Sequence, residues 1–172
     1  MGLLDLLVSR GADIVEDLPE ELKDKKSMAE TIENNIRKTI VDENPTNPKY
    51  FEKMSVLLDE LIEQRKQEVI DYKKYLEEMA RLAEQVKRPQ GSNYPKEINT
   101  PGKQAIFDNF SQDTDWVLSL DHAIQTNKQD GYLTNKMKQK RLKAQLKPLT
   151  DEKGLDIDEV FELIIKQAEY GA

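Results

Sequence analysis

Residues 49–88 contain neither glycine nor proline, and apolar side chains recur along them at intervals of seven. They form two rows, Phe51, Leu58, Tyr72, Met79 and Val86, and, three residues behind, Met54, Leu61, Tyr75 and Leu82. Such a repeat is typical of a helix that packs along a coiled-coil-like seam. Asn47 and Pro48 suit the N-cap and the first position of a helix. The pattern therefore predicts one helix from residue 48 to about residue 87, about 60 Å long.

Arg65 and Glu68 interrupt the two rows at their middle, so we expect a polar layer at the centre of this seam. The residues predicted to form the seam are Phe51, Met54, Leu58, Leu61, Tyr72, Tyr75, Met79 and Leu82. Their packing surface is either the chain's own core or a partner protein. A third alternative is a structural homodimer without a nucleic-acid role. In it the long helices pair with each other, and Arg65 and Glu68 match across an antiparallel axis.

The rest of the chain is also predicted to be helical. Apolar residues at spacing four indicate a helix at about 28–41. Thr100 with Pro101 opens another, Asp113 or Thr114 caps a third, Pro148 is expected to end a basic helix, and Asp156 begins the last. No stretch alternates with the period of a strand. We expect an all-α fold, a helical bundle built around the long helix, in a single domain over residues 1–172: residues 1–87, a linker at 88–99 and residues 100–172.

Composition narrows the class of protein. The chain has 34% charged residues and no cysteine, which excludes a disulfide framework and favours an intracellular, cytoplasmic location. Its apolar runs are short, so neither a signal peptide nor a membrane-spanning helix is expected.

Residues suited to catalysis are few. There is no glycine-rich phosphate-binding motif, and the single histidine, His122, cannot form a metal-binding cluster. Asp17, Glu21 and Lys23 echo a metal-nuclease spacing, but they lie in what is expected to be a charged helix start rather than at converging strand ends. We expect a non-catalytic chain without a metal or cofactor.

The segment 135–147 carries six positive charges and no negative charge, although the chain has a formal net charge of −7. On a helix, Lys136, Lys140, Lys143 and Lys147 fall within about 60° of arc. This lysine stripe is either a solvated face or a binding site for nucleic-acid phosphates or an acidic partner.

Several longer blocks resemble the C-terminal helical region of the restriction subunit (R subunit, HsdR) of type I restriction–modification enzymes. They are residues 32–87 (IENNIRKTIVDENPTNPKYFEK…EQVK), 94–110 (YPKEINTPGKQAIFDNF), 120–124 (LDHAI) and 161–170 (FELIIKQAEY), with RGADIVEDLPEEL upstream. Together they cover nearly the whole chain.

The resemblance implies a fragment of a larger ATP-driven DNA translocase and nuclease. The nuclease carboxylates and the motor residues that use ATP and Mg²⁺ would lie in domains outside this chain. The implied role is assembly of the R subunit, with its own motor domains and the methyltransferase and specificity subunits as partners. It leaves contact with translocated DNA open.

Overall fold

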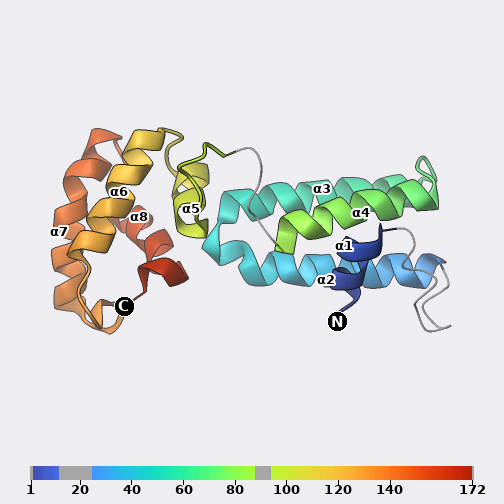
Figure 1. Cartoon of the computed structure of the whole chain (residues 1–172), viewed down its shortest axis with the longest axis horizontal. Helices are drawn as coiled ribbons and strands as arrows, with labels where there is room; N and C mark the ends of the chain where they lie inside the picture. Colours follow the sequence, from blue (N-terminus) through green and yellow to red (C-terminus); the bar gives the residue numbers. More distant parts are fainter. Residues whose placement is uncertain (1, 12–24, 88–93, 172) are drawn as a thin grey trace. The chain divides into compact units, whose positions relative to one another are not determined.

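The computed structural model describes residues 2–11, 25–87 and 94–171, and these form α-helices and short 3-10 helices without a strand among them. The all-α prediction is therefore confirmed for the described residues. The chain divides into two compact units, coloured along the sequence in Figure 1. Unit 1 comprises Met1–Asn44 and Phe51–Pro89, and unit 2 comprises Pro45–Tyr50 and Gln90–Ala172.

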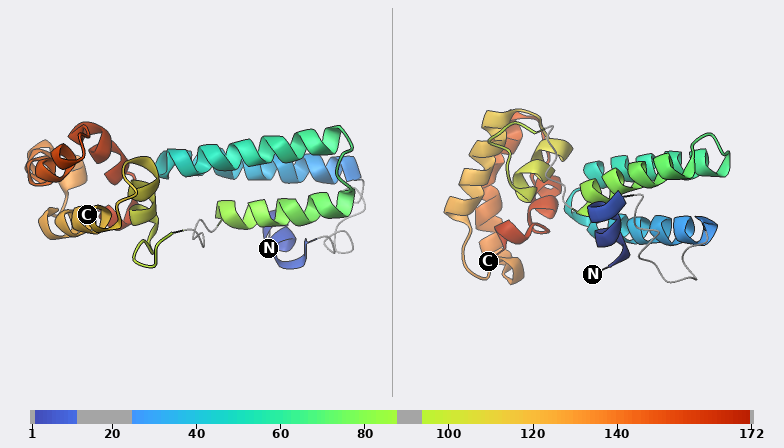
Figure 2. Two further views of the ribbon diagram at one scale, coloured as in Figure 1. Left: turned by 90° about the horizontal axis from the view of Figure 1, so that it is seen from above. Right: turned by 45° about the vertical axis from the view of Figure 1, so that its right-hand side comes forward.

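Unit 1 contains α1 (Leu3–Arg10), α2 (Lys25–Glu43), most of α3 (Pro48–Lys66) and α4 (Tyr72–Lys87). The three longer helices lie along one another in both Figure 1 and Figure 2, and α1 packs against α4 and α2. Apolar residues three or four apart on each helix face inward and exclude water. The largest fully buried side chains of this unit are Leu7, Met28, Ile32, Ile36, Phe51, Leu58, Tyr75, Leu76 and Met79.

The prediction of one helix of about 40 residues is wrong, because α3 ends at Lys66 and α4 begins at Tyr72. Between them Glu68 adopts a φ of 57°, in the left-handed region that interrupts a right-handed helix. The two longest described α-helices, α2 and α3, have 19 residues each. Arg65 and Glu68 thus mark the end of one helix and the following turn, and not a polar layer inside a continuous seam.

Asp71 is the residue before α4 and caps its N-terminus. Its side-chain Oδ1 accepts a hydrogen bond from the backbone N–H of Lys74 at 2.8 Å, and its carbonyl accepts one from the N–H of Tyr75 at 2.9 Å. This is the arrangement of a helix N-cap, which satisfies backbone donors that have no partner within the helix.

Unit 2 is built from α5 (Pro101–Asn109), α6 (Thr114–Asn127), α7 (Lys136–Glu152) and α8 (Ile157–Ile164), with 3-10 turns at Tyr132–Thr134 (η4) and Ala168–Tyr170 (η5). The predicted caps Thr100, Asp113 and Asp156 each accept a backbone hydrogen bond at the start of their helix. Its core includes Ile106, Trp116, Val117, Leu120, Ile124, Tyr132, Leu142, Leu146, Val160, Phe161, Ile164 and Tyr170.

Pro148 does not end the basic helix as expected, since α7 continues to Glu152. A proline inside a helix removes one hydrogen bond, here to the carbonyl of Ala144. Ala144 and Pro148 are both exposed, so water can satisfy that carbonyl.

Residues 45–50 belong to unit 2 through a cluster of side-chain amides. Asn47 Nδ2 donates to Asp108 Oδ2 at 2.8 Å, and Asn109 Nδ2 donates to Asn47 Oδ1 at 2.6 Å. Gln167 Nε2 donates to the carbonyl of Thr46 at 2.6 Å. We call Thr46, Asn47, Asp108, Asn109 and Gln167 the amide cluster.

The expected linker at 88–99 is described only in part, since residues 88–93 lie outside the described residues. Tyr94 and Ile98 pack against the core of unit 2, and the Tyr94 hydroxyl donates to Asp108. Part of the segment expected to be a linker therefore contributes to the core of unit 2.

Replacing Glu68 with glycine should stabilise the protein by about 0.5–1 kcal/mol, because glycine adopts a positive φ without steric cost. The measurement is the free energy of unfolding in denaturant. Lys53→Gly, at an exposed position inside α3, is the control and should destabilise by about 1 kcal/mol. Equal losses in both variants would contradict a special conformation at Glu68.

Candidate interaction surfaces

The predicted seam residues fall on α3 and α4. Phe51, Met54 and Leu58 on α3 and Tyr75, Met79 and Leu82 on α4 are buried within unit 1. Leu61 and Tyr72 are half-buried, and the two lie near the turn between the helices. Most of the seam therefore packs inside unit 1 and leaves little apolar surface for a partner.

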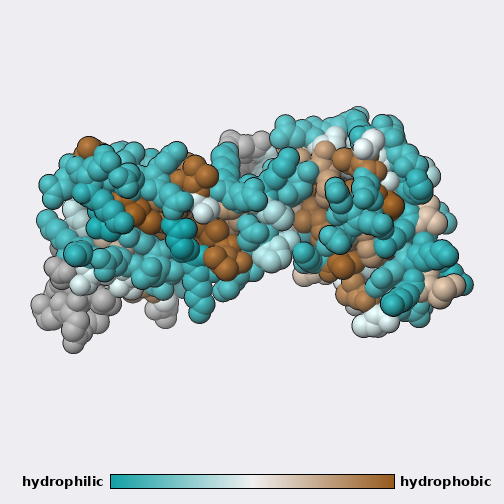
Figure 3. All heavy atoms as spheres, turned by 180° about the vertical axis from the view of Figure 1, so that it is seen from behind, coloured by the Kyte–Doolittle hydropathy of each residue, from teal (hydrophilic) through white to brown (hydrophobic). Residues whose placement is uncertain are grey.

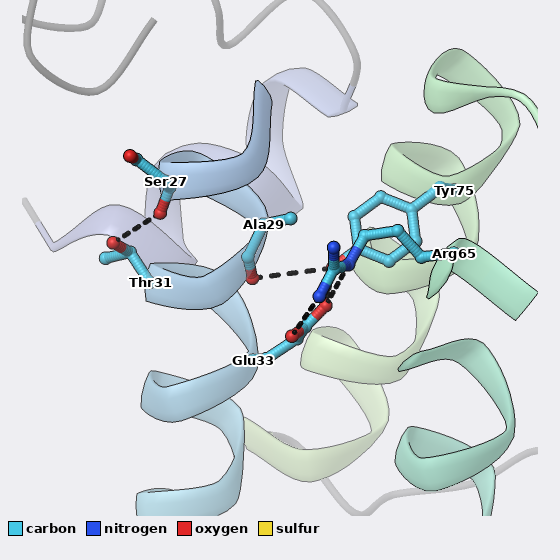
Figure 4. A network of polar contacts seen from close by, with 6 residues as sticks. All are labelled: Ser27, Ala29, Thr31, Glu33, Arg65 and Tyr75. Atoms are coloured by element: carbon cyan, nitrogen blue, oxygen red, sulfur yellow. Dashed lines mark hydrogen bonds and ion pairs between the residues drawn. The ribbon is translucent and has the colours of Figure 1, made fainter. Parts of the chain in front are cut away.

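A buried carboxylate joins the three long helices of unit 1 (Figure 4). Glu33 on α2 accepts two hydrogen bonds from Arg65 on α3, to Nε at 2.7 Å and to the terminal guanidinium at 3.1 Å. It also accepts one from the hydroxyl of Tyr75 on α4 at 2.7 Å. The Glu33 side chain is only 9% exposed, so these three bonds replace the water that its charge would otherwise need.

The environment of this network shifts two pKa values. The hydrogen bond from Arg65 to Glu33 raises the pKa of the Arg65 guanidinium. Burial, and then the hydrogen bond to Glu33, raises the pKa of the Tyr75 hydroxyl. Both shifts favour a charged Arg65 and a neutral Tyr75 hydroxyl, the forms that donate hydrogen bonds to Glu33.

A groove runs between α3 and α4, with a volume of about 430 Å³. Leu57, Leu61, Ile70 and Leu82 provide its apolar lining. Its charged lining residues are Glu60, Lys74, Glu78 and Arg81, and Glu78 pairs with both Lys74 and Arg81 at 3.3 and 2.9 Å. The groove has no cluster of polar groups aimed at one point, as a small-molecule site usually has.

Other exposed apolar side chains of unit 1 are scattered. Val41, Val56 and Val69 are 64%, 55% and 68% exposed, and they lie on three different segments. In the space-filling view of Figure 3, the brown apolar groups of unit 1 are separated by teal hydrophilic ones, whereas those of unit 2 lie closer together. Isolated apolar residues of this kind are common on protein surfaces and do not define a binding site.

The predicted lysine stripe lies on α7, but its four members differ in their surroundings. Lys143 pairs with Asp158 of α8 at 3.1 Å, and its Nζ lies 4.9 Å from the centre of the Phe161 ring. Lys147 pairs with Asp151 at 2.9 Å. Lys136 and Lys140 are exposed, and neither forms an ion pair with another described residue.

Two features of this helix escaped the sequence analysis. Asp158 follows the Asp156 cap of α8, and only the packing of α7 on α8 brings it to Lys143. Arg141, which lies outside the stripe, is exposed beside Lys140. Between Gly131 and Thr150 the sequence contains no acidic residue, so an acidic partner for the first half of α7 can come only from outside that range.

The remaining sequence candidates do not assemble into a site. His122 is exposed on α6, and Asp17, Glu21 and Lys23 lie outside the described residues. In the described ranges no group of three or more potential metal ligands comes together. Nor does any helix in them have the length and apolar character needed to cross a membrane.

In comparisons with known proteins, the chain matches no family model, no curated protein and no solved structure.

Changing Glu33 to Gln should destabilise the protein by about 2–3 kcal/mol, because it leaves the Arg65 charge without its carboxylate in a poorly hydrated place. Tyr75→Phe should cost less, about 1–2 kcal/mol, since it removes one hydrogen bond. Denaturant unfolding measures both variants.

The matched control is the triple variant Glu33→Leu with Arg65→Met and Tyr75→Phe, which replaces the ion pair and the buried hydroxyl by apolar groups. It should recover much of the loss, as apolar replacements of buried pairs often do. Full stability of Glu33→Gln alone would contradict the role given to this carboxylate.

Proposed function

We propose that the chain is a non-catalytic helical interaction domain like the C-terminal region of R subunits of type I restriction–modification enzymes. In this role it works in the cytoplasm. It helps the R subunit, with its motor domains, assemble with the methyltransferase–specificity core. DNA contact is a secondary part of the proposal.

The observation that carries the proposal is the ordered set of sequence blocks, taken together with where they meet. Thr46 and Asn47 lie in the first block, Asp108 and Asn109 in the second, and Gln167 in the last. All five belong to the amide cluster, which joins them through hydrogen bonds of 2.6–2.8 Å. The 45–50 segment of the first block thus packs with the second and last blocks inside unit 2, which supports reading these three blocks as parts of one domain.

A role without catalysis agrees with the chemistry of the described side chains. The best-buried carboxylate, Glu33, is held by Arg65 and Tyr75 and is not accessible to a substrate. In the proposed role ATP and Mg²⁺ would act only on domains outside this chain. The domain then contributes a binding surface for assembly and a rigid scaffold that holds this surface, and packed helices provide such rigidity.

The homodimer alternative requires Arg65 and Glu68 of two chains to pair with each other, and their surroundings do not favour this. Arg65 is engaged by Glu33 of the same chain, and Glu68 lies in the turn after α3. A dimer would therefore have to form through other side chains, such as those lining the α3–α4 groove.

The test is a titration of the chain into its cognate methyltransferase–specificity core, followed by sedimentation velocity. Saturable formation of a larger species, with the free chain sedimenting as a monomer, is the expected outcome. The core of an unrelated type I enzyme serves as the control and should bind much more weakly. Self-association of the chain without binding to the cognate core would refute the proposal in favour of the homodimer.

A further inference from the structure

The two long sides of α7 differ in chemistry. Leu142, Leu146 and Thr150 are buried against the rest of unit 2, where α6 and α8 pack on α7. On the opposite side Lys136, Lys140 and Arg141 are exposed, together with Met137, which is 61% exposed. At 100° per residue these four lie within about 140° of arc, centred away from the buried side.

Ion pairing separates this exposed face from the rest of the lysine stripe. Asp158 neutralises Lys143, Asp151 neutralises Lys147, and Lys138 donates to the carbonyl of Asp130. In the part of the chain that the structure describes, no carboxylate pairs with Lys136, Lys140 or Arg141. The available positive charge of α7 therefore lies in its first half.

We propose that Lys136, Lys140 and Arg141 form a binding site for the phosphate backbone of duplex DNA. This proposal rests on the proposed function only for the choice of DNA as the polyanion. It changes the predicted stripe in two ways, because it excludes Lys143 and Lys147 and includes Arg141. We call the three residues the cationic face.

The composition of the cationic face favours a polyanion over an acidic protein. Protein interfaces usually have an apolar centre. On the exposed side of α7, Met137 is the only large apolar side chain. Contacts with DNA phosphates gain from the release of condensed counterions, which needs exposed cations and no apolar surface.

The same composition favours duplex backbone over single-stranded bases. Binding of single strands generally uses aromatic side chains on which bases stack. The sequence of α7 contains no aromatic residue. Lys136 and Lys140 are one helical turn apart, a rise of about 6 Å, which places their ammonium groups in a row that can follow a phosphate backbone.

The test measures fluorescence anisotropy of a labelled DNA duplex titrated with the full chain at several salt concentrations. Three phosphate contacts predict that log K falls by about 2.7 per decade of salt. Lys136→Gln with Lys140→Gln should reduce that slope to about 0.9 and weaken binding at low salt by about tenfold or more. Arg141→Gln alone should reduce the slope by about 0.9.

Lys143→Gln with Lys147→Gln is the matched control, with the same change of charge on the same helix. It should leave the affinity and the slope close to those of the unchanged chain. Circular dichroism melts of all variants check that α7 remains folded, and Arg141→Gln stands in if a double variant does not fold. Polyglutamate serves as a competing polyanion without phosphates and should displace the duplex poorly.

Three results would overturn the proposal: no saturable binding of duplex by the unchanged chain, equal losses in the two double variants, or displacement by polyglutamate as effective as by unlabelled DNA. These outcomes do not depend on assembly with the methyltransferase–specificity core. A chain that binds the core but not DNA retains the proposed function and loses this site. A chain that binds DNA through the cationic face but does not bind the core retains this site and loses the proposed function.

Discussion

Unit 1 depends on the neutralisation of one buried charge. Glu33 lies in the middle of an otherwise apolar helix face, between Ile32 and Ile36, where a carboxylate without partners would oppose folding. Arg65 and Tyr75 supply those partners from α3 and α4, so three helices must take one register for the charge to be satisfied. The apolar residues around it favour compaction in many registers. The carboxylate is the feature that distinguishes one of them.

The same principle operates in unit 2, where uncharged donors satisfy a carboxylate and the side-chain amides around it. Each amide of the cluster has at least one partner, and these hydrogen bonds hold residues 45–50 against the ends of α5 and α8. Asp108, which accepts from Asn47 and Tyr94, has amide and phenol donors in place of a cation. Burial, followed by the charge of Asp108, raises the pKa of the nearby Tyr50 hydroxyl to about 12. Both units thus take their specific arrangement from a few satisfied polar groups within apolar surroundings.

Local signals in the sequence predicted local structure well. Thr100, Asp113 and Asp156 cap helices as expected, because capping requires only a side-chain oxygen and the next turn of backbone. The apolar periodicity identified most side chains that are buried on α3 and α4, because burial follows the helical period on either side of a turn. It did not reveal the turn itself. The heptad spacing continues in phase from Leu58 to Tyr72, and the Asp71 cap lacks the proline or glycine that usually marks a break.

The surface of α7 shows where sequence periodicity stops being informative. Lys143 and Lys147 share a stripe with Lys136 and Lys140, yet their partners differ. Asp151 is one turn away and could be anticipated, whereas Asp158 reaches Lys143 only through the packing of α8. Pro148 was expected to end the helix, but its missing hydrogen bond falls on the solvent side, where its cost is small. Tertiary surroundings decide both outcomes.

The division of the chain into units has a consequence for how it can be taken apart. Unit 2 is discontinuous in sequence. Its segment Pro45–Tyr50 lies between two segments of unit 1, which end at Asn44 and begin again at Phe51. A cut anywhere near residue 90 would separate Asn47 and Thr46 from Asp108, Asn109 and Gln167, and would leave their hydrogen-bonding groups without partners. The segment after residue 90 is therefore not a transferable module. Transfer of unit 2 to another protein would therefore require two pieces of sequence, residues 45–50 and the segment that begins at residue 90.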